Sequence, residues 1–151
     1  MEYNKEKDNK SYLLIALTLC LLAVVFIMMA SIILIPEVRK CLRFLFPYFL
    51  GISFTVLGVA LIYLTLKKNL KGKLKLFLIL TGGCAVGSFI SVVLHNLIYG
   101  LFIVLFDPGF WERVGLGDEP FFFILSLVVF PIGFIIGQIG SIFYFLKRKI
   151  N

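Results

Sequence analysis

The sequence contains few charged residues, and this scarcity excludes several classes of protein. Only 15% of its 151 residues are Asp, Glu, Lys or Arg, whereas about a quarter are charged in soluble domains. Hydrophobic residues make up 61% of the chain, which is more than a soluble core of this size can bury. The composition therefore excludes a disordered chain and a small disulfide-stabilised domain. It indicates an integral membrane protein.

Histidine and cysteine are also scarce. His95 is the single histidine, so one copy of the chain cannot build a multi-histidine metal centre. The three cysteines are an odd number with no Cys-X-X-Cys pair, so they indicate neither a disulfide framework nor a redox motif. We therefore expect no cofactor and no metal ion.

Four long apolar stretches are free of Asp, Glu, Lys and Arg. Each has at least the roughly 20 residues that a helix needs to cross the hydrocarbon core, and none alternates as a transmembrane strand does. Ion-coupled transporters and voltage sensors place ionisable groups inside such segments, so these classes are disfavoured. The sequence predicts an all-α, polytopic four-transmembrane-helix bundle that forms one membrane domain over residues 1–151, with spans at about 12–35, 47–66, 76–106 and 121–146.

Capping residues and prolines mark the expected helix ends. Asn9 or Ser11 is expected to cap the first span, and Asp118 to cap the fourth, because short polar side chains accept hydrogen bonds from free backbone N–H groups. Pro36 is expected to end the first span. Pro131 lies inside the fourth span and is expected to kink it.

The basic residues predict the orientation. Eleven of the 15 Lys and Arg residues lie in the N-terminal tail, the loop at 67–75 and the C-terminal tail. Basic residues flanking membrane spans favour the cytoplasmic side, so both termini are expected in the cytoplasm (N-in/C-in), with the protein in the cell membrane. Nucleic acid is not an expected partner, because binding it requires a basic face on a folded soluble surface.

Residues 37–46 are expected to form a short interfacial helix. Its apolar residues recur at helical spacing while its cations lie on other faces. The alternative is a simple charged turn. The apolar positions are Val38, Cys41, Leu42 and Leu45.

Small residues recur every four positions in the third and fourth spans, which places them on one face of each helix. Because close approach of small residues joins helices in lipid, we expect these two stripes to form a packing seam within the chain. The alternative is that one stripe forms a homodimer. Counting from the span ends pairs Gly83 with Ser141, Gly87 with Gly137, and Ser91 with Gly133. A weaker stripe in the second span, expected to face the first span, contains Gly51, Thr55 and Gly58.

Polar residues inside the spans form a candidate site near the outer end of the third span. His95, Asn96 and Tyr99 lie within about one helical turn. In a functional interpretation, His95 is a ligand or general base surrounded by acids of the last loop. In a structural interpretation, which we favour, these residues tie down the end of the helix through hydrogen bonds. Gln138 is expected to form a hydrogen bond between helices.

The third apolar stretch is longer than one crossing requires. Its 31 residues would extend about 46 Å as a helix, so it must tilt, break near His95–Gly100, or protrude from the bilayer. Residues 97–106 are too apolar to stand in water, so we expect the last loop, lipid or another subunit to cover them.

Three functions remain open from the sequence. The first is a non-enzymatic membrane protein that acts through helix–helix assembly, as a homo-oligomer or as a subunit of a larger membrane complex, with the lipid bilayer as its environment. The second is a small channel or carrier for a neutral or lipid-like solute along Ser91, His95, Asn96 and Tyr99. The third is an intramembrane enzyme centred on His95.

Overall fold

Most of the chain that the structure describes is helical, and short turns join the helices. This computed structural model describes residues 2–41 and 46–150, and side chains within 9–38 and 48–147; no strand occurs in these ranges. The elements are α1 (Glu2–Leu34), α2 (Pro36–Cys41), α3 (Phe46–Lys67), α4 (Gly72–Leu105), α5 (Phe110–Arg113), α6 (Pro120–Ile124), the π-helical turn η1 (Leu125–Val129) and α7 (Phe130–Ile150).

Four of the helical segments are long and apolar enough to cross a membrane, as the sequence predicts. Together α6, η1 and α7 make up the fourth of them. The segments are Asn9–Leu34, Tyr48–Lys67, Gly72–Leu105 and Pro120–Lys147. The all-helical fold class is therefore confirmed.

Two predicted helix starts are wrong. The first helix begins at Glu2 and continues through Asn9 and Ser11, so neither residue caps it; the preceding segment is rich in Glu and Lys, which are good helix formers. In the fourth span the N-cap is Glu119 rather than Asp118.

Pro36 separates α1 from α2. The residue before a proline is disfavoured in helical conformation, and Ile35 is the non-helical residue between the two helices. Proline is favoured at the first position of a helix, which suits the start of α2 at Pro36. Helix α2 covers the first part of the predicted interfacial helix, whereas Leu42 and Leu45 lie outside the described residues.

Helix α4 is continuous over 34 residues. The expected alternative of a break near His95–Gly100 is therefore wrong. At about 1.5 Å per residue, α4 extends roughly 51 Å, well beyond the hydrocarbon core. Of the expected alternatives, a tilt of α4 in the bilayer and protrusion of its end from the bilayer remain.

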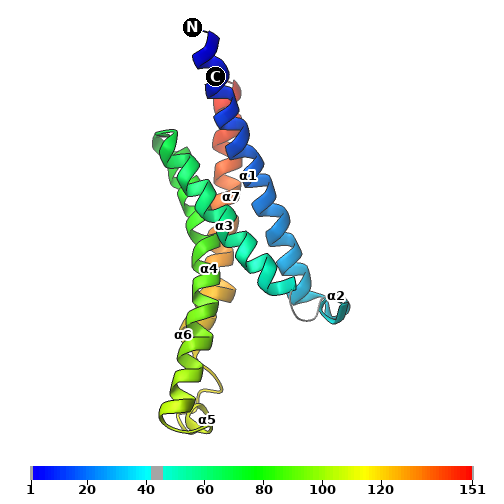
Figure 1. The fold of residues 1–151 in the computed structure, drawn as a ribbon, viewed down its shortest axis with the longest axis vertical. Coiled ribbons are helices and arrows are strands. Elements are labelled where there is room, and N and C mark those ends of the chain that lie inside the picture. The colour runs from blue at the N-terminus through cyan, green and yellow to red at the C-terminus, as the bar shows by residue number, and fades with distance from the viewer. Residues whose placement is uncertain (1, 42–45, 151) are drawn as a thin grey trace.

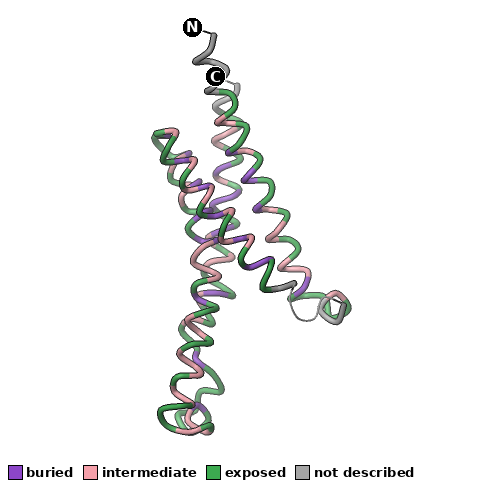
Figure 2. The backbone as a smooth tube through the Cα atoms, viewed as in Figure 1, coloured by how far each residue is buried: buried purple, intermediate pink, exposed green. Residues whose placement is uncertain are grey.

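Figure 1 shows how the long helices are arranged. Both termini and the turn between α3 and α4 lie toward one end of the molecule. Toward the other end, the second half of α4, together with α5 and α6, diverges from α1 and α3. We call residues 92–126 the outer arm. Buried residues gather where the long helices cross and are sparse in this arm (Figure 2).

Three aromatic rings fill the crossing of α1, α3 and α7. The ring of Phe134 lies 4.7 Å from that of Phe26 and 5.0 Å from that of Phe54, between centroids. Phe54 and Phe134 are each only 2% exposed. Aromatic pairs at such separations contribute about 0.5–1.5 kcal/mol beyond their burial, so this cluster fixes where the three helices cross.

Glycine brings α4 into direct backbone contact with both neighbours. A Cβ added at Gly58 of α3 would lie 2.9 Å from the carbonyl oxygen of Gly82 in α4, and a Cβ added at Gly137 of α7 would lie 2.8 Å from the backbone nitrogen of Thr81. Both separations are too short for any real side chain. The weaker stripe of α3 therefore faces α4, and its expected contact with the first span is wrong.

The register between α4 and α7 differs from the predicted one. Gly133 lies against Cys84 and Gly137 against Thr81, where the sequence pairs them with Ser91 and Gly87. The difference is six to seven residues, or roughly 9–10.5 Å along the helix. The predicted pairings of these residues, and that of Gly83 with Ser141, are therefore wrong.

The cause of the shifted register is the relative height of the helix ends. The prediction assumed that α4 starts level with the end of α7. Because Phe77 contacts Gly140, Gly72 is level with about residue 145, and α7 continues to Ile150 beyond it. Gly83 consequently leaves the contact face: it is exposed, and nothing lies within 4 Å of a Cβ added there.

The remaining residues of the two stripes have different surroundings. A Cβ added at Gly87 would lie 2.6 Å from the ring of Phe130. Ser91 is 4% exposed and Ser141 is fully buried. The absence of a side chain at Gly87 thus leaves room for an aromatic ring of α7 rather than for a second glycine.

The helix changes its hydrogen-bond pattern just before Pro131. The backbone N–H of Phe130 donates to the carbonyl of Leu125, five residues back. Proline lacks the N–H that would continue an ordinary ladder, and one π-helical turn accommodates such a defect. A π-helical turn therefore directly precedes Pro131, and the kink expected at Pro131 stays a prediction.

We expect Gly137→Ala to destabilise the protein, because its new methyl group would collide with the α4 backbone at Thr81. Overpacking of this kind costs about 1–3 kcal/mol. Gly100→Ala in α4 is the matched control, since open space surrounds it and alanine is the better helix former. Thermal unfolding in detergent should show a lower Tm for the first variant and an unchanged or higher Tm for the second. Equal Tm values would contradict the contact.

Candidate functional site

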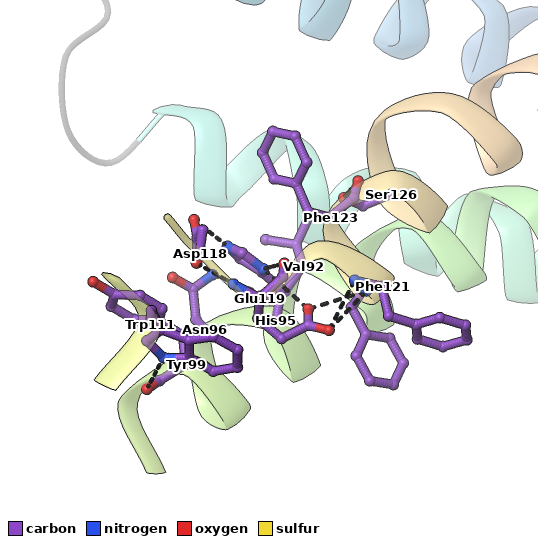
Figure 3. Close-up of polar contacts among 11 residues, drawn as sticks. Val92, His95, Asn96, Tyr99, Trp111, Asp118, Glu119, Phe121, Phe123 and Ser126 are labelled. Atoms are coloured by element: carbon purple, nitrogen blue, oxygen red, sulfur yellow. Dashed lines mark hydrogen bonds and ion pairs between the residues drawn. The ribbon is translucent and has the colours of Figure 1, made fainter. Parts of the chain in front are cut away.

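The candidate site lies in the outer arm, where α4 meets the start of α6. His95 of α4 faces Asp118 and Glu119, which directly precede α6 (Figure 3). The structure thus brings the histidine together with two acids of the last loop. Asp107 of the same loop instead pairs with Arg113.

Both ring nitrogens of His95 have acidic neighbours. Nδ1 lies 3.1 Å from the backbone carbonyl oxygen of Glu119 and 3.3 Å from its carboxylate Oε2. Nε2 lies 3.4 Å from Oδ2 of Asp118. The side chain of Glu119 is 7% exposed and that of Asp118 is 49% exposed, so the site has one buried and one solvated carboxylate.

Local sequence explains the position of Glu119. Pro120 occupies the first position of α6, where its missing N–H costs nothing. The Glu119 carboxylate accepts hydrogen bonds from the backbone N–H groups of Phe121 and Phe122, at 2.9 and 3.0 Å. Asp118 in turn accepts from the N–H of Glu119 at 2.7 Å. Helix capping therefore fixes both acids before they meet the histidine.

Asn96 and Tyr99 do not join the histidine contacts. Asn96 is exposed, and its amide donates to the carbonyl oxygen of Val92 in its own helix at 2.7 Å. Tyr99 stacks on Trp111 of α5 with ring centroids 6.0 Å apart. Trp111 also donates from Nε1 to the carbonyl of Tyr99 at 3.4 Å.

An aromatic cluster holds α5 against the end of α4. Trp111 is 8% exposed, and its ring lies 5.2 Å from that of Phe102. Phe106 and Phe110 stack at 4.8 Å. The last loop therefore covers part of residues 97–106, as expected, while Leu97 and other residues of this stretch remain exposed.

Asp107, which precedes α5, pairs with Arg113 at the end of α5. Their side chains form an exposed ion pair. The hydrogen bond from Arg113 lowers the pKa of Asp107 below its usual value. Exposed ion pairs contribute little to folding stability. We therefore interpret this pair as a contact that defines the conformation of the loop.

Gln138 lies away from this site, at the crossing of α7 and α1. Its Nε2 donates to the carbonyl oxygen of Leu19 at 3.0 Å, which is a contact between two helices of the kind expected from the sequence. Its Oε1 and the hydroxyl of Ser141 are buried without a partner among the described residues. Nothing places Gln138 with His95.

The contacts of the site suit proton binding and hydrogen bonding. Among the described residues, no group of three or more His, Cys, Asp and Glu side chains has a geometry suited to a metal ion. No Ser, Thr or Cys hydroxyl or thiol forms a hydrogen bond with His95 in the part of the chain that is described. The arrangement therefore gives little support to nucleophilic catalysis.

We expect Glu119→Ala to loosen the start of α6, because the helix loses its N-cap and His95 loses a partner. Loss of an N-cap costs about 0.5–2 kcal/mol. Glu112→Ala, at an exposed acid of α5, is the control. Hydrogen exchange followed by mass spectrometry should show faster exchange over 120–126 in the first variant only. Unchanged protection in both would contradict the capping role.

No protein-family model matches this chain, and no characterised protein or solved structure shows significant similarity to it. Its function is therefore inferred from the geometry of the chain itself.

Proposed function

We propose that the chain forms a four-transmembrane-helix bundle in the cell membrane with both termini in the cytoplasm. The two termini and the α3–α4 turn lie toward one end of the molecule (Figure 1), and eleven of the 15 Lys and Arg residues belong to these segments. Positively charged flanks favour the cytoplasmic side. The outer arm then lies at the opposite surface of the membrane.

We propose further that the protein is non-enzymatic and acts through helix–helix assembly, with a second copy packing on α4. The observation that carries this proposal is the open surface at Gly83, where a bare backbone is exposed within the membrane-spanning helix. Exposed apolar residues surround it on the same face. They are Leu76, Leu80, Ile90, Leu97, Leu101 and Val104.

The spacing of this face suits association with an identical helix. Positions 76, 83, 90, 97 and 104 recur every seven residues, the period at which two helices keep one seam in contact along their length. In a symmetric dimer each residue near the axis meets its own copy, so Gly83 would face Gly83. Exposed apolar side chains are ordinary in lipid, but a glycine at the centre permits the close backbone approach that joins membrane helices.

The two alternative functions receive less support from the geometry. A carrier path requires Ser91, His95, Asn96 and Tyr99 to share one surface, yet Ser91 is buried and Asn96 is exposed. An enzyme centred on His95 requires a free ring nitrogen and a reactive partner, and both nitrogens face acceptor groups. Assembly requires neither arrangement.

We expect Gly83→Ile to convert the assembled protein to monomers, because a branched side chain separates the two backbones. Gly100→Ile is the matched control: Gly100 is also helical with open space around it, but it lies about 100° around the helix from Gly83. Single-molecule photobleaching in native-lipid nanodiscs reports the number of copies. A monomeric wild type, or equal copy numbers in both variants, would contradict the proposal.

A further inference from the structure

The contacts of His95 cannot all be satisfied by a neutral imidazole. A neutral ring has one N–H donor and one acceptor nitrogen, whereas the imidazolium has two donors. Nδ1 faces a backbone carbonyl, which only accepts, so it must carry a hydrogen. Nε2 faces the carboxylate of Asp118, and in the neutral ring it would present a lone pair to an oxygen.

The two carboxylates are already committed as acceptors. Glu119 accepts from two backbone N–H groups, and Oδ1 of Asp118 accepts from a third. Within the described residues, the ion pairs of both acids are made with His95 alone. Loss of the imidazolium proton would therefore leave two neighbouring negative charges with no cation between them, which is unfavourable near the membrane surface.

The other charged and titratable groups of the outer arm do not replace this cation. Arg113 of α5 pairs with Asp107. Glu112 of α5 is exposed and has no described contact with the ring. Tyr99 of α4 stacks on Trp111. Helix α6 contributes the ring of Phe123 at 5.6 Å, and neither α6 nor η1 contains a titratable side chain.

The elements joined by these contacts have few other attachments. Helices α6 and η1 pack mainly against α4, and the outer arm diverges from α1 and α3 (Figure 1). The π-helical turn η1 directly follows α6, and such turns are frequent at functional sites. This arrangement would allow the capped start of α6 and the preceding loop to move on α4 while α7 keeps its place in the crossing.

We propose that His95, Asp118 and Glu119 form a proton-operated latch. The imidazolium holds the loop and the start of α6 against α4, and loss of its proton releases them. Histidine changes charge between about pH 5 and 8, so the closed form is favoured at the acidic end of this range and the open form at the basic end. The proposal is independent of assembly through α4, since it requires only one copy of the chain.

Trp111 provides the measurement. It is the single tryptophan of the chain, lies in α5 of the last loop, and is buried against Tyr99 and Phe102 of α4. We expect acrylamide to quench its fluorescence more strongly at about pH 8 than at about pH 5.5 in neutral-lipid nanodiscs. Hydrogen exchange over residues 106–126, corrected for intrinsic rates, should lose protection over the same range. A wild type without either transition overturns the latch.

Three variants separate the latch from a merely structural contact. His95→Gln cannot titrate, so we expect the transition to be lost. Asp118→Asn offers Nε2 a donor as well as an acceptor, so the neutral ring is satisfied and the loop should remain protected at both pH values. Glu112→Gln, in α5 of the same loop, should keep the wild-type transition. A transition of wild-type size in His95→Gln or Asp118→Asn, or its loss in Glu112→Gln, would contradict the proposal.

Discussion

The structure depends on the direct contact of the α4 backbone with both of its main neighbours. Hydrophobic burial drives little association between helices in lipid, so dispersion contacts at short range must supply it. Gly58 meets Gly82 on one side of α4, and Gly137 meets Thr81 on the other. A side chain at either contacting glycine would push the helices apart. The aromatic crossing of α1, α3 and α7 then sets the angle around these contacts.

The outer arm is held by a different kind of interaction. Few of its residues are buried, and its closest links are hydrogen bonds, ion pairs and stacked rings. Polar contacts depend on protonation and solvent, whereas packed glycine contacts do not. The molecule therefore combines a part whose geometry is fixed by close backbone packing with a part held by polar contacts around His95 and by stacked rings. The polar contacts lie at one end of the molecule.

The sequence predicts the four apolar helices well because their length and lack of charge leave few alternatives. It does not predict the partners of the glycines, because a register depends on the relative heights of helix ends. Gly83 shows this clearly: it shares a stripe with Gly87, yet only Gly87 has a neighbour. The sequence suggests acids of the last loop around His95 as only one of two interpretations. The contact with Glu119 depends on how this loop folds back onto α4. The N-cap of α6 is Glu119 rather than Asp118, and this choice depends on the backbone conformation at the start of the helix.

The register of α4 against α7 is most directly tested by a disulfide. A Cβ added at Gly133 lies 2.7 Å from the sulfur of Cys84, so Gly133→Cys with Cys20 and Cys41 replaced by Ser should cross-link to the native Cys84 under mild oxidation. Mass spectrometry of the digested monomer identifies the linked peptides. We expect the 84–133 bridge, and no bridge when Ser91→Cys replaces Cys84 as the partner. Cross-linking of position 133 to position 91 instead would contradict it.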